Sequence, residues 1–251
     1  MRAKIMLRDF LLALALLAGA TALCAATGLD LAMERRFYLE GAGWGLTEIN
    51  PWRFLYHYGV LPAYLLAGAA LLVLLAGFFW ARAYPLRRSA LFLVLLLALG
   101  PGLLVNTVFK DHWGRPRPRQ MQVFGGDRQF HEVWDRGAGT SGRSFPSGHA
   151  SAAFYLMAPY FVLRTRYRRR AYLALLGGIG YGVFMGVARM VQGGHFPSDV
   201  LWAGGVVYLV GLALYYLLRL DQEGLPGSLP AAGLSAEAPG QLPADKEPCA
   251  P

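Results

Sequence analysis

Residues 171–199 read AYLALLGGIGYGVFMGVARMVQGGHFPSD, an apolar run that ends abruptly in polar residues. The run is about as long as the ~20 residues that a helix needs to cross the hydrocarbon core of a bilayer. Within it, Gly178, Gly182 and Gly186 recur every four residues, which gives a smooth face for close helix packing. The charged residues that end the run lie where a membrane surface would be. Charge in that position is costly and indicates a function.

The composition of the whole chain agrees with a membrane protein. Of its 251 residues, 55% are hydrophobic and only 16% are charged, and the mean hydropathy is +0.37. Such a chain is too apolar for an ordinary soluble domain. The net charge of +9 would also suit a nucleic-acid binder, but the basic residues lie between apolar runs and not on a soluble surface. We therefore expect an anionic phospholipid or glycolipid as the partner, and no nucleic acid.

Six apolar runs of roughly 16–24 residues are candidates for membrane spans. They lie at 9–31, 59–81, 88–109, 148–164, 171–190 and 200–219. The sequence thus predicts an all-α polytopic membrane protein with six transmembrane helices in one domain, 1–220. The first run is longer than the apolar core of a secretory signal, so we expect an uncleaved span. Residues 221–251 are rich in Pro, Gly, Ala and Glu, and we expect a disordered cytoplasmic tail there.

Basic residues in the short loops predict the orientation. They precede the first span and fill the loops after the second and fourth spans: Arg2, Lys4, Arg8, Arg82, Arg87, Arg88, Arg164, Arg166, Arg168, Arg169 and Arg170. By the positive-inside rule, this side is cytoplasmic. The remaining loops then meet on the opposite face, which is periplasmic in a bacterial inner membrane. Loop 110–147 is itself basic, which fits this orientation only if its charges serve the function.

Three polar clusters fall on the predicted periplasmic face, and the first is KDHWGRPRP at 110–118. It combines the ammonium of Lys110 with guanidinium groups that can each bind two phosphate oxygens. Arg115 and Arg117 both precede a proline, so the pattern leaves open which one is the main phosphate ligand. A basic segment that only binds lipid head groups would look similar.

The second cluster, FPSGH at 145–149, is typical of a helix start. With Pro146 in the first helical position, the free N–H groups of Ser147 and Gly148 would form an anion site strengthened by the helix dipole. Gly148 would let a substrate approach the backbone, and His149 is a candidate proton donor. A capped helix start without a catalytic role has the same pattern.

The third cluster is GHFPSD at 194–199. If Pro197 opens the last helix, Asp199 lies in its first turn, where its carboxylate either stabilises the helix N-terminus or holds a ring nitrogen of His195. A His–carboxylate pair has the basicity and the fixed tautomer that a nitrogen nucleophile requires. Arg189, six residues upstream of the histidine, would bind the same phosphate.

Together the three clusters resemble the signature of the type 2 phosphatidic acid phosphatase (PAP2) superfamily. The matching positions are, in chain order, Lys110-x6-Arg117-Pro118, Pro146-Ser147-Gly148-His149 and Arg189-x5-His195-x3-Asp199. The resemblance covers about 105–200 through motifs and 59–219 through the pattern of spans. One departure is Ala188, where the family usually has serine, so that one hydroxyl contact is lost.

The resemblance implies cleavage of a phosphate ester through a phosphohistidine, without a metal or another cofactor. His195 would attack phosphorus, Asp199 would orient it, and His149 would protonate the leaving oxygen and later activate water. The implied phosphate ligands are Lys110, Arg117, Arg189, and the backbone of Ser147 and Gly148. These roles suit the chemistry, since phosphoryl transfer depends on positioning and on charge around the phosphoryl oxygens.

Lipid A phosphate is the substrate that we favour from the sequence. The stretch QVFGGD at 122–127 is similar to bacterial lipid A phosphatases, and loop 119–143 is long enough to recognise a large head group. Undecaprenyl diphosphate and phosphatidylglycerophosphate are alternatives, and a lipid phosphotransferase would use the same residues. A haloperoxidase-like relative would hold vanadate but is typically soluble. A non-catalytic lipid-binding protein would be expected to lack His149 or His195.

Overall fold

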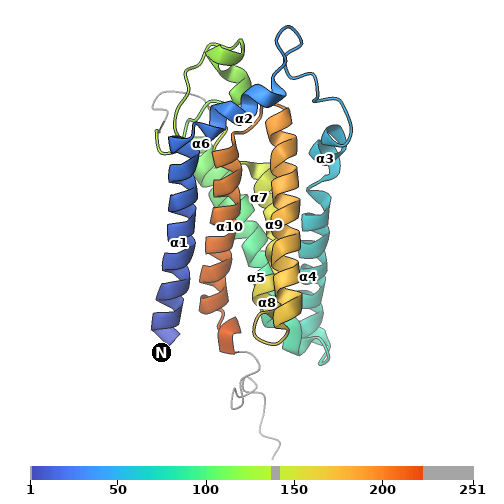
Figure 1. Ribbon diagram of the computed structural model, residues 1–251. Coiled ribbons are helices and arrows are strands. Elements are labelled where there is room, and N and C mark those ends of the chain that lie inside the picture. Colours follow the sequence, from blue (N-terminus) through green and yellow to red (C-terminus); the bar gives the residue numbers. More distant parts are fainter. Residues whose placement is uncertain (1, 137–141, 223–251) are drawn as a thin grey trace, which may run out of the picture.

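The computed structural model describes residues 2–136 and 142–222, in which the regular secondary structure is helical and no β-strand occurs. Long helices run side by side along one axis, and short helices and loops cover one end of the bundle (Figure 1). The all-α class predicted from the sequence is therefore confirmed. The predicted tail lies outside the described residues apart from its first two, which end the short helix η6 (Leu220–Gln222).

The long helices coincide with apolar stretches of the sequence. They are α1 (Arg2–Ala26), α4 (Leu61–Phe79), α5 (Arg87–Leu97), α9 (Arg168–Val191) and α10 (Pro197–Leu217). The helix α3 (Trp52–Tyr58) leads into α4, and α5 continues through the π-helical segment η2 (Ala98–Phe109) into α6 (Lys110–His112). Single turns occur at η1 (Tyr84–Leu86), η3 (Pro118–Gln120) and η4 (Gln122–Phe124).

Five helical segments in the described part of the chain are long and apolar enough to cross a membrane. They are Arg2–Ala26, Trp52–Phe79, Tyr84–His112, Arg168–Val191 and Pro197–Leu217. The stretch predicted as a span at 148–164 differs from these. It consists of α7 (Gly148–Phe154), η5 (Tyr155–Met157) and α8 (Pro159–Leu163), and most of its residues are buried. The tighter turn at η5 and the proline that follows it interrupt the α-helical hydrogen bonding.

The first apolar run is also divided. The helix α1 ends at Ala26, and Gly28 adopts a left-handed backbone with φ of 60°, a conformation that glycine tolerates without steric cost. The helix α2 (Leu29–Phe37) then lies across the end of the bundle (Figure 1). The predicted single span over 9–31 is therefore wrong at its C-terminal end. Asp30 and Glu34 on α2 are buried against the bundle.

The glycine spacing in α9 does allow close packing, as the sequence predicted. A Cβ atom on Gly178 would lie 2.3 Å from the backbone nitrogen of Met157, and one on Gly182 would lie 2.2 Å from the ring of Phe154. Both distances are shorter than real Cβ contacts allow. The helix α9 therefore packs directly on α7 and η5, and this contact fixes the start of α7 near the end of α9.

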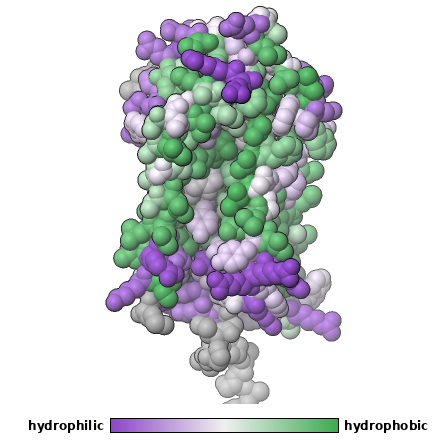
Figure 2. All heavy atoms as spheres, in the orientation of Figure 1, coloured by the Kyte–Doolittle hydropathy of each residue, from purple (hydrophilic) through white to green (hydrophobic). Residues whose placement is uncertain are grey.

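On the face drawn in Figure 2, a hydrophobic band lies between two hydrophilic ends of the bundle. Leucines on three different helices are exposed in the bundle, among them Leu16, Leu72 and Leu176 at 74%, 68% and 64%. So many exposed leucines are typical of a surface that contacts lipid. The arginine-rich loops after α4 and α8 lie at one end, and the segments that carry the three polar clusters lie at the other (Figure 1).

Candidate active site

A cavity of about 460 Å³ lies at the end of the bundle that carries the polar clusters. Five of the eight site residues predicted from the sequence line it: Lys110, Arg117, His149, Arg189 and His195. They come from α6, the loop after it, α7, the end of α9 and the turn before α10. The fold thus brings together all three polar clusters, which are separated by tens of residues in the sequence.

The imidazole of His195 is held by the backbone and is only 2% exposed. Its Nδ1 lies 2.6 Å from the carbonyl oxygen of Ser144, which can only accept a hydrogen bond. Nδ1 therefore carries the proton, and Nε2 keeps its lone pair. Burial, and then the nearby cations led by Arg189 and Lys110, lower the pKa of His195 well below its ordinary value. A neutral imidazole with a free Nε2 is suited to nucleophilic attack.

Asp199 does not hold the ring of His195 directly, which corrects one of the two roles predicted for it. Its Oδ2 is 3.9 Å from Nδ1, too far for a hydrogen bond. That oxygen already accepts the hydroxyl of Ser144 at 2.5 Å and the backbone N–H of Phe196 at 2.9 Å. Asp199 therefore stabilises the start of α10, which is the other role predicted for it, and supports His195 through Ser144. Ser144 precedes the FPSGH cluster, and nothing in the sequence pattern identified it.

Tyr56 of α3 aligns two of the predicted site residues. The ring of His149 stacks on it with centroids 5.2 Å apart and an interplanar angle of 16°. The guanidinium carbon of Arg189 lies 4.7 Å from the centroid of the same ring. Tyr56 also lines the cavity. The sequence pattern does not single out Tyr56, because an aromatic residue at the start of an apolar run is common at membrane interfaces.

Three cations of the cavity have no carboxylate partner in the described part of the chain, whereas Arg53 is paired with Glu48 at 3.6 Å and both line the cavity. Within residues 2–136 and 142–222, no ion pair is formed by Lys110, Arg117 or Arg189. The ammonium of Lys110 donates to the side-chain oxygen of Asn106 at 3.2 Å. Arg189 is 6% exposed, donates from Nη1 to the side-chain oxygen of Gln192, and leaves Nε without a partner in this part of the chain. These three cations, which have no carboxylate partner in the described residues, together form a site for an anion.

The geometry resolves which arginine of the first cluster can bind phosphate. Arg115 is fully buried, and its guanidinium forms ion pairs with Asp30 at 2.7 Å and with Asp199 at 2.6 Å. Arg117 is half-buried and lines the cavity. Arg115 is therefore structural, and Arg117 is the candidate phosphate ligand.

The start of α7 differs from the prediction. The helix begins at Gly148 with Ser147 as its N-cap, so Pro146 lies before the helix and not in its first position. The N–H of Ser147 donates to the backbone oxygen of Asp199 at 3.3 Å, so the prediction that this group is free is wrong. A Cβ atom on Gly148 would lie 2.4 Å from Oδ1 of Asn106 and 3.0 Å from Nζ of Lys110. Glycine is required here by the side chains that support the anion site.

The family model of the PAP2 superfamily matches residues 89–222, which is more than half of the chain. The chain belongs to the PAP2 superfamily. The matched segment begins in α5 and holds the residues of all three polar clusters. The helices α2 and α3, which contribute Asp30 and Tyr56, lie outside it.

Curated relatives of this PAP2 protein are named as lipid phosphatases. The chain is 39% identical over 138 residues to the lipid A 4'-phosphatase of Francisella tularensis subsp. novicida, covering 55% of this chain and 61% of that protein. It is 38% identical over 119 residues to the lipid A 4'-phosphatase of Rhizobium leguminosarum, covering 46% and 50%. It is 28% identical over 192 residues to the phosphatidylglycerophosphatase B of Bacillus subtilis, covering 74% and 76%.

The chain thus spans less than two thirds of the length of both lipid A 4'-phosphatases. No solved structure matches it significantly.

Proposed function

We propose that this protein is a membrane lipid phosphatase that acts through a phosphohistidine at His195, with lipid A phosphate as the favoured substrate. The observation that carries the proposal is the cavity itself. It places a neutral imidazole with a free Nε2 beside three cations that have no carboxylate partner in the described residues. Such a site attracts a phosphate group and offers it a nucleophile.

In the first step, Nε2 of His195 attacks phosphorus as the bond from phosphorus to the lipid oxygen breaks. His149, which is protonated once the phosphate anion is bound beside it, gives this proton to the leaving oxygen and becomes neutral. The phosphorylated imidazole carries a positive charge, which the carbonyl of Ser144 and the carboxylate of Asp199 stabilise from the Nδ1 side. In the second step, His149 takes a proton from water, the water oxygen bonds to phosphorus, and the nitrogen–phosphorus bond breaks. Inorganic phosphate leaves, and His195 is neutral again.

The cations of the cavity stabilise the transferring phosphoryl group. Lys110, Arg117 and Arg189 surround the space in front of His195, and the charge of the transition state is spread over the three equatorial oxygens. Preorganised donors in a site with little water are worth more than the same donors in solution. These residues supply the charge that a divalent cation provides in many other phosphoryl-transfer sites.

The choice of lipid A rests on the relatives and on the rim of the cavity. The relatives from Francisella and Rhizobium are named as lipid A 4'-phosphatases. Arg119 also lines the cavity and adds further positive charge for a large anionic head group, whereas Arg53 is paired with Glu48 at 3.6 Å. Phosphatidylglycerophosphate is the second candidate, because the Bacillus relative is named for it and matches the larger share of this chain. Undecaprenyl diphosphate and a lipid phosphotransferase reaction would use the same residues.

We further propose six membrane spans in a bacterial inner membrane, with both termini cytoplasmic and the cavity facing the periplasm. The predicted stretch 148–164 would be the sixth span, and its helical part, which ends at Leu163, corresponds to only ~24 Å of helix. The arginine-rich loops at the opposite end support this orientation by the positive-inside rule. Cysteine labelling of intact cells tests it after Cys24 and Cys249 are replaced. A cysteine at position 130 should be labelled and one at 168 should not, and the reverse pattern would contradict the proposal.

The activity is tested by incubating the purified protein in detergent with lipid A, phosphatidylglycerophosphate or undecaprenyl diphosphate, with EDTA present. We expect release of inorganic phosphate from lipid A in particular, and inhibition by vanadate, which mimics five-coordinate phosphorus. Activity that disappears with EDTA and returns with Mg²⁺ would overturn the mechanism.

The roles of the two histidines are tested with leaving groups of different basicity. His195→Ala should reduce turnover of every substrate to background, because the nucleophile is lost. His149→Ala should impair lipid substrates most, because an acid matters most when the leaving oxygen is basic. p-Nitrophenyl phosphate should therefore rescue much of the activity of His149→Ala. Equal losses on both substrates in folded variants would reject this division of roles.

A further inference from the structure

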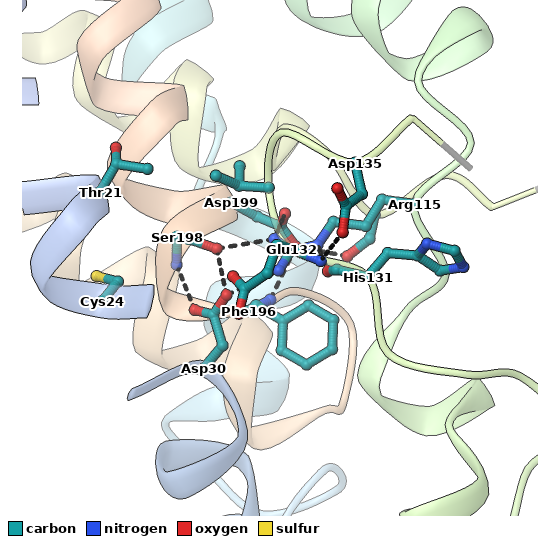
Figure 3. Close-up of polar contacts among 12 residues, drawn as sticks. Thr21, Cys24, Asp30, Arg115, His131, Glu132, Asp135, Phe196, Ser198 and Asp199 are labelled. Atoms are coloured by element: carbon teal, nitrogen blue, oxygen red, sulfur yellow. Dashed lines mark hydrogen bonds and ion pairs between the residues drawn. The ribbon is translucent and has the colours of Figure 1, made fainter. Parts of the chain in front are cut away.

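Asp30, on a helix outside the matched family segment, belongs to a buried network that ends at the candidate nucleophile. Figure 3 shows Arg115 between the carboxylates of Asp30 and Asp199, with Ser198 beside them. All four side chains are nearly or fully buried, with relative exposures between 0% and 3%. Nothing in the spacing of the sequence relates Asp30 to the polar clusters.

The hydrogen bonds of the network fix each carboxylate. Nη2 of Arg115 donates to Oδ2 of Asp30 at 2.7 Å, and Nη1 donates to Oδ1 of Asp199 at 2.6 Å. Ser198 closes the ring, because its hydroxyl donates to Oδ2 of Asp30 at 2.5 Å and accepts from Nη1 of Arg115 at 2.7 Å. The backbone N–H of Ser198 donates to Oδ1 of Asp30 at 2.9 Å. Asp30 therefore fastens α2 to the first turn of α10, which carries Asp199.

The charges of the network have a consequence for His195. One cation lies between two carboxylates, so one negative charge remains uncompensated in a buried place. His195 becomes positively charged when it is phosphorylated, and Asp199 lies 3.9 Å from its Nδ1. If Asp30 were absent, Arg115 would neutralise Asp199, and the imidazolium would lose its counter-charge. Electrostatic effects of this kind are strong because the site is buried.

The neighbouring carboxyl group of Glu34 does not replace Asp30. Glu34 lies one turn further along α2, is fully buried, and has neither carboxylate oxygen hydrogen-bonded within the described residues. Burial, followed by the negative charges of Asp199 and Asp30, raises the pKa of Glu34 well above its ordinary value and so favours its neutral form. Nε of Arg115 is used by the carbonyl oxygen of His131 at 2.9 Å.

We propose that Asp30 is a positioning residue, which engages Arg115 so that Asp199 keeps a net negative charge toward His195. This inference rests on the proposed phosphohistidine reaction. It extends the functional unit beyond the matched segment 89–222 to α2.

The test compares Asp30→Asn with the matched control Glu34→Gln, which changes a buried carboxyl group on the same helix that has no hydrogen bond within the described residues. We expect Asp30→Asn to lower kcat for phosphate release about 10- to 100-fold, a loss typical of removing a group that supports a site residue, with little change in KM. Glu34→Gln should stay close to the original protein. A folded Asp30→Asn variant with unchanged kcat would overturn the proposal.

A double variant separates charge from structure. In Asp30→Asn with Arg115→Met, Asp199 no longer has a neutralising cation, so kcat should recover to within about tenfold of the original protein. If Asp30 had only a structural role, kcat of the double variant should be lower still than that of Asp30→Asn, because a second buried contact is lost. If Asp30→Asn does not fold, the double variant alone is compared with the original protein. A folded but inactive double variant would overturn the proposal in either case.

Vanadate binding distinguishes failure of this inference from failure of the proposed function. Vanadate should bind at His195 whether or not the correct lipid has been found, and Asp30→Asn should weaken that binding about tenfold or more. An original protein that binds vanadate but releases no phosphate from any lipid would contradict the proposed function. Unchanged vanadate affinity in Asp30→Asn would contradict the role of Asp30.

Discussion

Replacing each of the two arginines of the first cluster by methionine should affect a different property: stability for Arg115 and activity for Arg117. Arg115→Met leaves the buried carboxylates of Asp30 and Asp199 without their cation. Breaking a buried ion pair by removing one partner costs about 3–5 kcal/mol. For a protein of this size, ~1 kcal/mol corresponds to about 2–4 °C in Tm, so we expect Tm to fall by about 6–20 °C. Arg117 is half-buried at the cavity, and Arg117→Met should change stability by only about 0.5 kcal/mol.

Activity should show the complementary pattern for Arg117. Removal of one donor to a developing negative charge lowers kcat by about 10²–10³-fold, and we expect that loss for Arg117→Met in protein with an unchanged melting curve. The measurements are thermal unfolding in detergent, followed by intrinsic fluorescence, and phosphate release below the melting transition. The reasoning would be refuted if Arg117→Met melted as early as Arg115→Met, or if Arg115→Met kept the original Tm.

Two further predictions concern the cavity. Gly148→Ala should lower kcat at least tenfold, because the added Cβ atom would displace Asn106 and with it the ammonium of Lys110. Gly180→Ala is the control and should have no effect, because its Cβ atom would meet nothing within 4 Å. Burial, and then cations that include Arg117, lower the pKa of His195, so kcat/KM should remain high as the pH falls through 6.5. Arg117→Met removes one of these cations and should move the acidic limb of the pH profile to higher pH. A pH profile identical in both proteins would contradict the second of these.

The sequence predicted which residues belong to the site better than it predicted the hydrogen bonds and ion pairs that join them. Lys110, His149 and His195 could be found because each lies at the end of an apolar run, where a charged or titratable group needs a reason. The residue types also matched a known signature in order. The helical class followed from composition and from the length of the apolar runs. These features depend on residues that are close together in the chain, so a single sequence is enough to recognise them.

The contacts that the sequence did not predict join distant segments. Asp30 and Arg115 are 85 residues apart, and their pairing depends on the break at Gly28 that turns α2 across the bundle. The hydrogen bond from His195 to the carbonyl of Ser144 involves backbone, which carries no sequence signal. The same limit explains the error at Ser147, since its N–H is taken by a backbone oxygen on another helix.

The site contains two groups of cations with opposite electrostatic roles. Arg115 is paired with carboxylates and holds α2, α10 and the loop after α6 together. Lys110, Arg117 and Arg189 lack such partners in the described residues, and their charge is available to a phosphate group. His195 lies between the two groups. Its pKa is lowered by burial and then by the nearby cations, and its positive charge after phosphorylation is stabilised by the carboxylates. When phosphate binds, it neutralises the unpaired cations and so raises the basicity of His195 at the moment when the imidazole must bond to phosphorus.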